Sequence, residues 1–330
     1  MTRGSEMGGG GDGLQPQMAV LSRAAWYSRW RDRAGSTHMA RQICEAAAAG
    51  DSDAHAVEGQ ALRTLAWQAK WLGRFREAEG HCLEAERRLA PDGASAALVD
   101  VYSIHCVIAY SRNDFASARE FIESAARMLD EDMPLETRLD VMASEALLMR
   151  HTGKPGDALR RINEALTLAS GPEAARLAHN RARLLNQLGE KANAFDAGRE
   201  AVQLARTHRN RVVFPYACEV MGQACRANGQ LDAAADILRE GLECAHEDGD
   251  LRAVCQIHEQ QAMVALDRGD AEAALALLRD GLLISEQINY PLWRRNFLRK
   301  LAEEYERRGD AEEALAAYRS LLALLDRSTR

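Results

Sequence analysis

The sequence predicts an all-α solenoid of about seven helix pairs preceded by an N-terminal half unit. A glycine or asparagine recurs at intervals close to 40 residues, an alanine follows each one five residues later, and a small residue precedes each of the last seven by seven residues. A chain that repeats one register in this way grows by stacking helical units. The turn residues are Gly35, Gly73, Asn113, Gly153, Gly189, Gly229, Gly269 and Gly309, and the alanines are Ala40, Ala78, Ala118, Ala158, Ala194, Ala234, Ala274 and Ala314. The preceding small residues are Ala66, Cys106, Ala146, Ala182, Gly222, Ala262 and Ala302.

Each turn residue is expected to end one helix and allow the next to begin. Glycine and asparagine adopt the left-handed backbone that terminates helices at little steric cost. Asp270 and Asp310 follow two of these glycines as N-caps, and Glu313 completes a capping box with Asp310. The small residues on both helices allow close approach at the crossing. The tripeptide Arg-Gly-Asp, which ends at each of these two aspartates, is therefore interpreted as a helix boundary. An adhesion motif would in addition require secretion, for which we find no signal.

The element boundaries follow from this register. Residues 1–17 are glycine-rich and polar, and we expect them to be disordered. Residues 18–50 are expected to form capping helices, over 18–34 and 36–49, residues 51–326 the repeat array, and 327–330 a tail. The pairs are expected at 55–72 with 75–89, 95–112 with 114–130, 135–152 with 155–169, 173–188 with 190–206, 212–228 with 230–247, 250–268 with 270–287, and 291–308 with 310–326. The prolines after position 90 all fall between pairs or in first helical turns, where a missing N–H group costs little.

Aromatic residues are concentrated in the first expected helix, which carries Trp26, Tyr27 and Trp30. One interpretation is a packed cap that covers the first repeat. The other is an aromatic patch that binds a partner.

The segment "GRFREA" from Gly73 to Ala78, with a large residue four positions after the alanine in most units, resembles the tetratricopeptide repeat (TPR) family. The resemblance covers residues 36–326. It differs from the family in its period of 40 instead of about 34 residues and in lacking the proline that closes each repeat. Helices of about 16–18 residues would absorb the longer period. The resemblance implies a right-handed superhelix similar to the sensory or interaction arrays of bacterial signalling proteins.

Composition and charge exclude several function classes. The net charge is −7, and the 42 basic and 49 acidic residues are interspersed without long blocks of one sign, so no nucleic-acid partner is expected. No apolar run is long enough to span a bilayer, and no signal peptide is evident, so we expect no membrane partner and a cytoplasmic location. Seven cysteines without a C-x-x-C pair are interpreted as reduced core thiols.

No residue pattern points to catalysis. The sequence lacks a phosphate-binding loop, and the near-match to a zinc-protease motif at His258-Glu259 has Ala262 where the second histidine would stand. We therefore expect no catalytic residues, no metal and no cofactor, and a protein that is not an enzyme.

The resemblance implies that the first helix of each pair lines a concave groove. On this register the side chains 13, 10, 6 and 3 residues before each turn residue face inward, and those at the centre of the array are polar and locally basic. Arginines there could hold a carboxylate or phosphate, amides could bind a peptide backbone, and tyrosines could serve as anchors. The alternative is a solvated wall whose arginines pair with Asp140, Glu219 and Glu259. The candidate ligand-binding residues are Tyr110, Arg150, Arg176, His179, Arg183, Asn186, Tyr216, Glu219, Gln223 and Arg226.

The last expected helix leaves Leu315, Leu322 and Leu325 on a face that no later repeat covers. They are expected either to form a homodimer or effector contact or to pack deeper on the preceding helix. Two hypotheses follow. The first is a non-catalytic, regulatory module that captures a protein or peptide in the groove. The alternative is the sensory or dimerisation region of a larger signalling protein, of the diguanylate cyclase or transcription-regulator type.

Overall fold

The computed structural model describes residues 14–49 and 55–328. These residues form sixteen α-helices and one short 3-10 turn, η2 (Ala90–Asp92), and the described part of the chain contains no strand. The helices are α1 (Leu14–Ser28), α2 (Arg33–Ala49), α3 (His55–Trp71), α4 (Phe75–Leu89), α5 (Ala96–Ser111), α6 (Phe115–Met128), α7 (Leu135–His151), α8 (Pro155–Leu168), α9 (Gly171–Leu188), α10 (Lys191–Thr207), α11 (Phe214–Ala227), α12 (Leu231–Glu247), α13 (Leu251–Asp267), α14 (Ala271–Gln287), α15 (Pro291–Arg308) and α16 (Ala311–Ser328).

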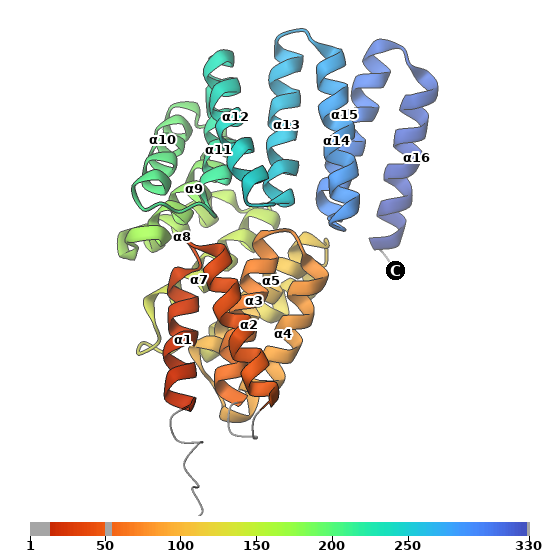
Figure 1. Ribbon diagram of the computed structural model, residues 1–330. Helices are drawn as coiled ribbons and strands as arrows, with labels where there is room; N and C mark the ends of the chain where they lie inside the picture. Colours follow the sequence, from red (N-terminus) through yellow and green to blue (C-terminus); the bar gives the residue numbers. More distant parts are fainter. Residues whose placement is uncertain (1–13, 50–54, 329–330) are drawn as a thin grey trace, which may run out of the picture.

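The helices pack as consecutive antiparallel pairs, and each pair stacks on the next (Figure 1). The predicted all-α solenoid is confirmed, with the seven expected pairs running from α3 to α16. The N-terminal half unit is a complete pair, because α1 and α2 pack on each other and both contact α3. Helix α1 begins one turn earlier than expected, so residues 14–17 are helical, whereas residues 1–13 of the expected disordered segment lie outside the described residues.

Seven of the eight expected turn residues have the left-handed backbone that ends a helix. Asn113 has φ of 68°, and the six remaining turn glycines, Gly73, Gly153, Gly189, Gly229, Gly269 and Gly309, have φ between 75° and 82°. Gly35 is the exception, because it lies in the first turn of α2 and its N–H group donates to the Asp32 carboxylate at 2.8 Å. Asp270 caps α14 as expected through the Ala273 N–H group at 3.0 Å. The capping box at Asp310 does not form, since that carboxylate pairs with Arg308 at 3.2 Å.

Small residues allow the helices of each pair to approach closely. Seven of the eight alanines that follow the turns are fully buried, and Ala314 is 6% exposed. A Cβ atom added at Gly222 would lie 2.6 Å from the Leu238 side chain across the α11–α12 contact. The repeated small positions therefore set the packing distance within each pair.

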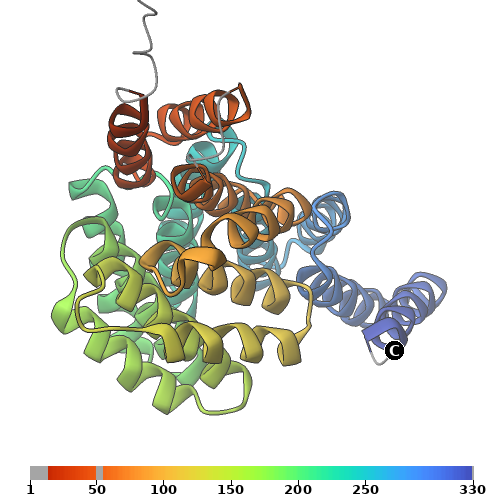
Figure 2. The same cartoon turned by 90° about the horizontal axis from the view of Figure 1, so that it is seen from below.

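The solenoid curves until its first helices meet its later ones (Figure 2). The Tyr216 hydroxyl of α11 reaches the carbonyl oxygen of Trp71 at the end of α3, at 3.2 Å. The Phe75 ring of α4 lies 5.1 Å from the Tyr290 ring, which precedes α15. The largest hydrophobic cluster crosses this junction, because it joins residues of α3 and α4 to residues of α11, α13 and α15. We call this junction, between α1–α4 and the helices α9–α15, the closing contact.

Candidate functional site

The inner face of the curved array encloses a cavity of about 520 Å³. Its walls come almost entirely from the first helix of each pair, namely α3, α5, α7, α9, α11, α13 and α15, and the volume lies within the range of about 300–1,000 Å³ common for ligand pockets. We call it the central cavity.

Six of the ten candidate binding residues line the central cavity. They are Tyr110, Arg150, Arg176, His179, Arg183 and Tyr216. These six come from α5, α7, α9 and α11, so helices that are far apart in sequence present them to one space. The register of the inward face accounts for this convergence.

The other four candidates do not line the central cavity. Asn186 donates a hydrogen bond to the Val220 carbonyl oxygen at 3.1 Å, so its amide joins α9 to α11. Glu219 is 4% exposed and accepts a hydrogen bond from Arg183 at 2.7 Å. Arg226 pairs with Asp267 at 3.0 Å. Gln223 lies next along the same face of α11, beyond the part of that helix that reaches the cavity.

Two of the lining arginines are neutralised by carboxylates of neighbouring helices, as the solvated-wall alternative anticipated. Arg176 pairs with Asp140 at 2.7 Å, and Arg183 pairs with Glu219 at 2.7 Å. The expected involvement of Glu259 is not found, because Glu259 pairs with Lys300 at 3.5 Å. These pairs contribute to the wall and leave Arg176 and Arg183 less available to a ligand.

Four other cations of the wall, Lys70, Arg150, Arg252 and Arg295, form no ion pair with a carboxylate of the described chain. Arg150 donates only to the Tyr110 hydroxyl, at 3.1 Å. The cavity thus presents uncompensated positive charge inside a protein of net charge −7.

Aromatic rings hold two of these cations in place. The Lys70 ammonium lies 4.8 Å from the Trp71 ring centroid, and the Arg252 guanidinium lies 5.5 Å from the same centroid and 5.4 Å from that of Tyr216. Such contacts favour a cation electrostatically over the ring face. Burial, together with the nearby guanidinium groups of Arg252, Arg176 and Arg29, lowers the pKa of Lys70 to about 7, although Asp140 opposes the shift.

His179 is the most isolated polar group of the wall. The residue is 5% exposed, and neither ring nitrogen has a hydrogen-bond partner of good geometry among the described residues, although the Asn180 side chain lies near the ring. Burial and the charges of Arg183, Arg252 and Arg150 lower its pKa well below the usual value, so the imidazole is neutral at pH 7. A neutral imidazole offers one donor and one acceptor to a bound molecule.

Sequence reasoning missed part of the wall for two separate reasons. Asn180 and Trp71 occupy positions nine and two residues before a turn residue, next to the expected inward positions, and a wider inward face would have included them. Arg252, Tyr290 and Trp293 lie at or just before the N-terminal ends of α13 and α15. They reach the cavity only because the closing contact brings those ends against α3, and no local pattern signals that.

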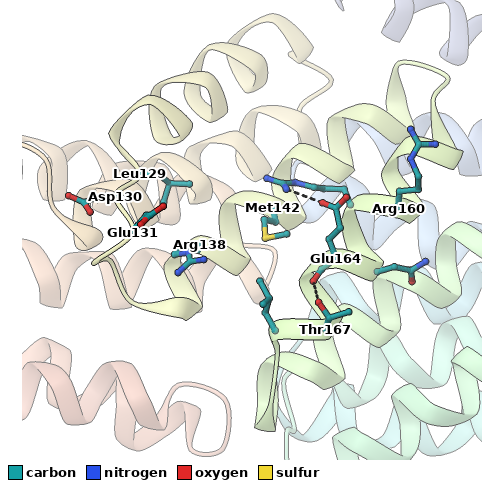
Figure 3. Close-up of a pocket in the computed structure, with 11 residues that line it drawn as sticks. Leu129, Asp130, Glu131, Arg138, Met142, Arg160, Glu164 and Thr167 are labelled. Atoms are coloured by element: carbon teal, nitrogen blue, oxygen red, sulfur yellow. Dashed lines mark hydrogen bonds and ion pairs between the residues drawn. The ribbon is translucent and has the colours of Figure 1, made fainter.

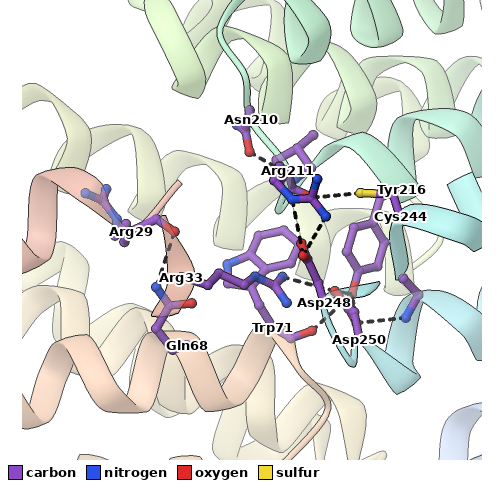
Figure 4. A network of polar contacts seen from close by, with 12 residues as sticks. Arg29, Arg33, Gln68, Trp71, Asn210, Arg211, Tyr216, Cys244, Asp248 and Asp250 are labelled. Carbon is purple, nitrogen blue, oxygen red and sulfur yellow. Dashed lines mark hydrogen bonds and ion pairs between the residues drawn. The ribbon is translucent and has the colours of Figure 1, made fainter. Parts of the chain in front are cut away.

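The closing contact contains a network of buried polar groups (Figure 4). The Tyr216 hydroxyl donates a hydrogen bond that is shared between Asp250 Oδ1, at 3.0 Å, and the Trp71 carbonyl oxygen. The other oxygen of Asp250 pairs with Arg33 at 3.1 Å. Asp250 also caps α13 through the Ala253 N–H group at 3.0 Å, so one carboxylate joins α2, α11 and α13.

A second buried cluster joins the end of α1 to α9. Glu173 Oε1 accepts from Arg29 Nη2 at 3.1 Å and from Trp30 Nε1 at 3.0 Å, and Glu173 Oε2 accepts from Arg176 Nε at 3.1 Å. The Trp30 ring contacts Trp67 at a centroid distance of 4.5 Å. Trp26 and Trp30 are therefore packed as the cap interpretation expects, while Tyr27 is 65% exposed.

A second hollow, of about 780 Å³, lies between α7, α8 and the segment after α6 (Figure 3). Two of its arginines are paired with nearby carboxylates, and Arg161 pairs with both Glu145, at 2.7 Å, and Glu164, at 3.2 Å. Arg160 likewise pairs with Asp157 at 2.7 Å. The central cavity is the stronger candidate site because four of its six basic side chains have no carboxylate partner among the described residues and because aromatic rings line the same space.

The three leucines singled out on α16 are exposed to different degrees. Leu315 is 50% exposed, Leu322 61% and Leu325 39%, whereas Ala314 and Ala317 face the preceding helix. The idea that all three pack deeper on their neighbour does not hold for Leu315 and Leu322.

Within the described residues no cluster of three or more His, Cys, Asp or Glu side chains could hold a metal ion. None of the described helices combines the length and apolar character needed to cross a membrane.

Comparison with known proteins identifies the fold. No family model and no curated protein matches the sequence. Among solved structures, the Rap conjugation gene regulator of plasmid pLS20 superimposes with a TM-score of 0.67 at 13% identity, covering 96% of each chain. A Rap protein complexed with competence and sporulation factor gives 0.64 at 12% identity, covering 95% of this chain and 99% of that one. The quorum sensor NprR of B. thuringiensis gives 0.61 at 13% identity, covering 94% and 87%. The chain therefore has the fold of the TPR-like helical-repeat proteins, as the resemblance in its sequence implied.

Proposed function

We propose that this protein is a non-catalytic regulator that binds a short peptide in the central cavity. The observation that carries the proposal is an aromatic and basic cavity built from the inner helices of seven repeats. Two of the compared structures support it. The pLS20 Rap protein was solved in complex with the Phr* peptide, and NprR, with a TM-score of 0.55 at 13% identity, in complex with its cognate peptide NprX.

The ligand contacts that we propose are the six candidates that line the cavity, extended by Trp71, Arg252 and Trp293. Tyr216 and Trp71 offer flat surfaces for apolar side chains, and polar groups around them fix the orientation of the bound molecule. Asn186, Glu219, Gln223 and Arg226 are assigned to the wall behind these contacts. The comparisons give no support to the alternative of a sensory or dimerisation region of a larger signalling protein.

A cavity-filling variant tests the proposal without altering charge. Val107 lines the cavity from α5, and Val107→Trp would occupy the space of a ligand. Leu283→Trp is the matched control, because Leu283 is 64% exposed on α14. Each protein is incubated with a pool of synthetic peptides of four to eight residues, and retained peptides are identified by mass spectrometry.

We expect wild type and Leu283→Trp to retain the same peptides and Val107→Trp to retain none, with unchanged helical circular dichroism. Equal retention by Val107→Trp would show that any peptide binds elsewhere.

A further inference from the structure

The central cavity has a strong imbalance of charge. Its described wall contains six basic side chains, those of Lys70, Arg150, Arg176, Arg183, Arg252 and Arg295, but one carboxylate, that of Asp140. Arg183 is paired with Glu219 behind the wall, and the pKa of Lys70 is lowered to about 7. Asp140 is already bonded to Arg176. The imbalance runs against the acidic character of the whole chain, so it is a local property of the cavity.

Four of these basic side chains share the wall with two histidines. Arg150, Arg183 and Arg252 all lie close enough to His179 for their charges to act on it, and Arg150 and Arg295 act in the same way on His151. These residues come from α7, α9, α13 and α15, and all four helices contribute to the wall of the cavity.

Positive charge that is withdrawn from water without a carboxylate partner is unfavourable, because the group has lost part of its hydration. Lys70 is buried, and Arg150, Arg252 and Arg295 are half-buried. The wall also retains bare polar atoms, namely both ring nitrogens of His179 and Arg252 Nε. A carboxylate placed among these groups would supply acceptors to guanidinium donors in the geometry that arginine binds best.

Apolar surface lies beside the basic groups. Trp71, Leu147, Leu292 and Trp293 line the same cavity, and Trp71 is in edge contact with Tyr216 at a centroid distance of 5.2 Å. A ligand that matches the whole wall therefore carries both a negative charge and an apolar group.

We propose that the ligand is an anionic peptide whose carboxylate is held by Arg150 and Arg252 beside His179, with an apolar side chain against Trp71 and Trp293. This inference rests on the proposed function and adds the ligand's charge. The carboxylate belongs either to the peptide terminus or to an acidic side chain.

The experiment uses pools of random pentapeptides, one with free carboxyl termini and one with amidated termini, screened against the full-length protein. Bound peptides are identified by mass spectrometry, and the affinities of resynthesised peptides are measured by calorimetry. The test variants are Arg150→Gln, whose one side-chain hydrogen bond is to Tyr110, and Arg252→Gln. Arg239→Gln is the control, since Arg239 pairs with Asp236 on the exposed face of α12.

We expect wild type and Arg239→Gln to select peptides richer in Asp and Glu than the pool, and each test variant to bind them about ten- to a hundredfold more weakly. Loss of binding on amidation would assign the site to the terminal carboxylate, and persistence of acidic selection in the amidated pool would assign it to a side chain. Selection of neutral or basic peptides would overturn the anionic ligand and leave the peptide function standing.

A second measurement separates the proposed peptide-binding function from the proposed anionic character of the ligand. Inorganic phosphate and glutarate are tested as plain anions by their effect on the thermal midpoint of wild type and Arg150→Gln. If no peptide binds but these anions stabilise the wild type alone, the anion site stands and the peptide function fails. If neither peptides nor anions bind, the anionic ligand is overturned as well. Because Arg252 also packs on two rings, circular dichroism of its variant accompanies each measurement, and Arg150→Gln decides the outcome if that variant is misfolded.

Discussion

The two ends of the solenoid are held in different ways. The first helices, α1–α4, are fixed against helices more than a hundred residues away by the edge contact of Trp71 with Tyr216, by buried ion pairs and by the shared hydroxyl of Tyr216. The last helix, α16, contacts α15 and leaves Leu315 and Leu322 exposed at the far end (Figure 1). One end therefore defines the cavity, and the other extends the array. The comparison shows that repeated local packing builds the array, whereas a few contacts between residues far apart in the sequence form the closing contact.

The closing contact should be the most sensitive part of the molecule to a single substitution. Glu173→Ala leaves Arg29 buried without its carboxylate, and the loss of one partner of a buried ion pair costs about 3–5 kcal/mol. Urea unfolding followed by circular dichroism measures the change. Glu272→Ala is the control, because Glu272 pairs with Arg308 on the surface, and it should unfold like the wild type. Similar midpoints for both variants would contradict this account of the closing contact.

Packing within a single repeat should be the next most sensitive feature. Ala234 is fully buried where α12 crosses α11, and Ala234→Leu overpacks that crossing at a cost of about 1–3 kcal/mol. Ala233→Leu, one residue earlier on the exposed face, should be nearly neutral in the same unfolding assay. If Ala234→Leu left the free energy of unfolding unchanged, the α11–α12 crossing would contain enough space for the larger side chain, and this account of the packing would be wrong.

Lys70 should make the stability of the folded protein depend on pH. Its ammonium is surrounded by Asp140 of α7, Arg176 of α9, Arg252 of α13 and Arg29 after α1, and burial lowers its pKa to about 7. Below pH 7 the Lys70 charge is present in both the folded and the unfolded states. The whole cost of burying that charge then lowers the free energy of unfolding. Between pH 7 and the ordinary pKa near 10.5, the unfolded chain holds a proton that the folded chain lacks, so wild-type stability rises with pH.

Lys70→Met removes this dependence. We expect it to stabilise the protein more at pH 6 than at pH 9, by a difference on the order of 1–2 kcal/mol, measured by urea unfolding at both values. A second variant, Lys70→Gln, removes the charge without adding apolar packing, so comparing it with Lys70→Met separates the two effects. An equal effect at the two pH values would show that Lys70 titrates normally.

The exposed face of α16 should be the least sensitive. Leu322→Gln alters a side chain that is 61% exposed, and surface substitutions of this kind stay within about 0.5 kcal/mol. Analytical ultracentrifugation of the same variant reports on the dimer contact expected for this helix. A clear loss of stability in the isolated chain would place Leu322 in the core instead.

The repeats could be predicted from the sequence because each depends on residues close together in the chain. Gly189, with φ of 75°, and the buried Ala194 belong to one local register. The lining of the cavity could be predicted only in part, because some of its contacts join residues that are far apart in the chain. His179 and Tyr216 follow from their position on an inner helix, but their pairing with Arg252 and Trp71 depends on curvature summed over several repeats. No short segment encodes that curvature, so the closing contact and the unpaired cations became visible only in three dimensions.

The central claim is that the closing contact holds the array tightly curved around a basic cavity. Small-angle X-ray scattering of the wild type and of a Glu173→Ala/Arg33→Gln double variant tests it directly. The account predicts that wild-type scattering matches the closed arrangement of Figure 2 and that the double variant becomes measurably more extended with its helical content retained. Wild-type scattering that fits an open solenoid would contradict it.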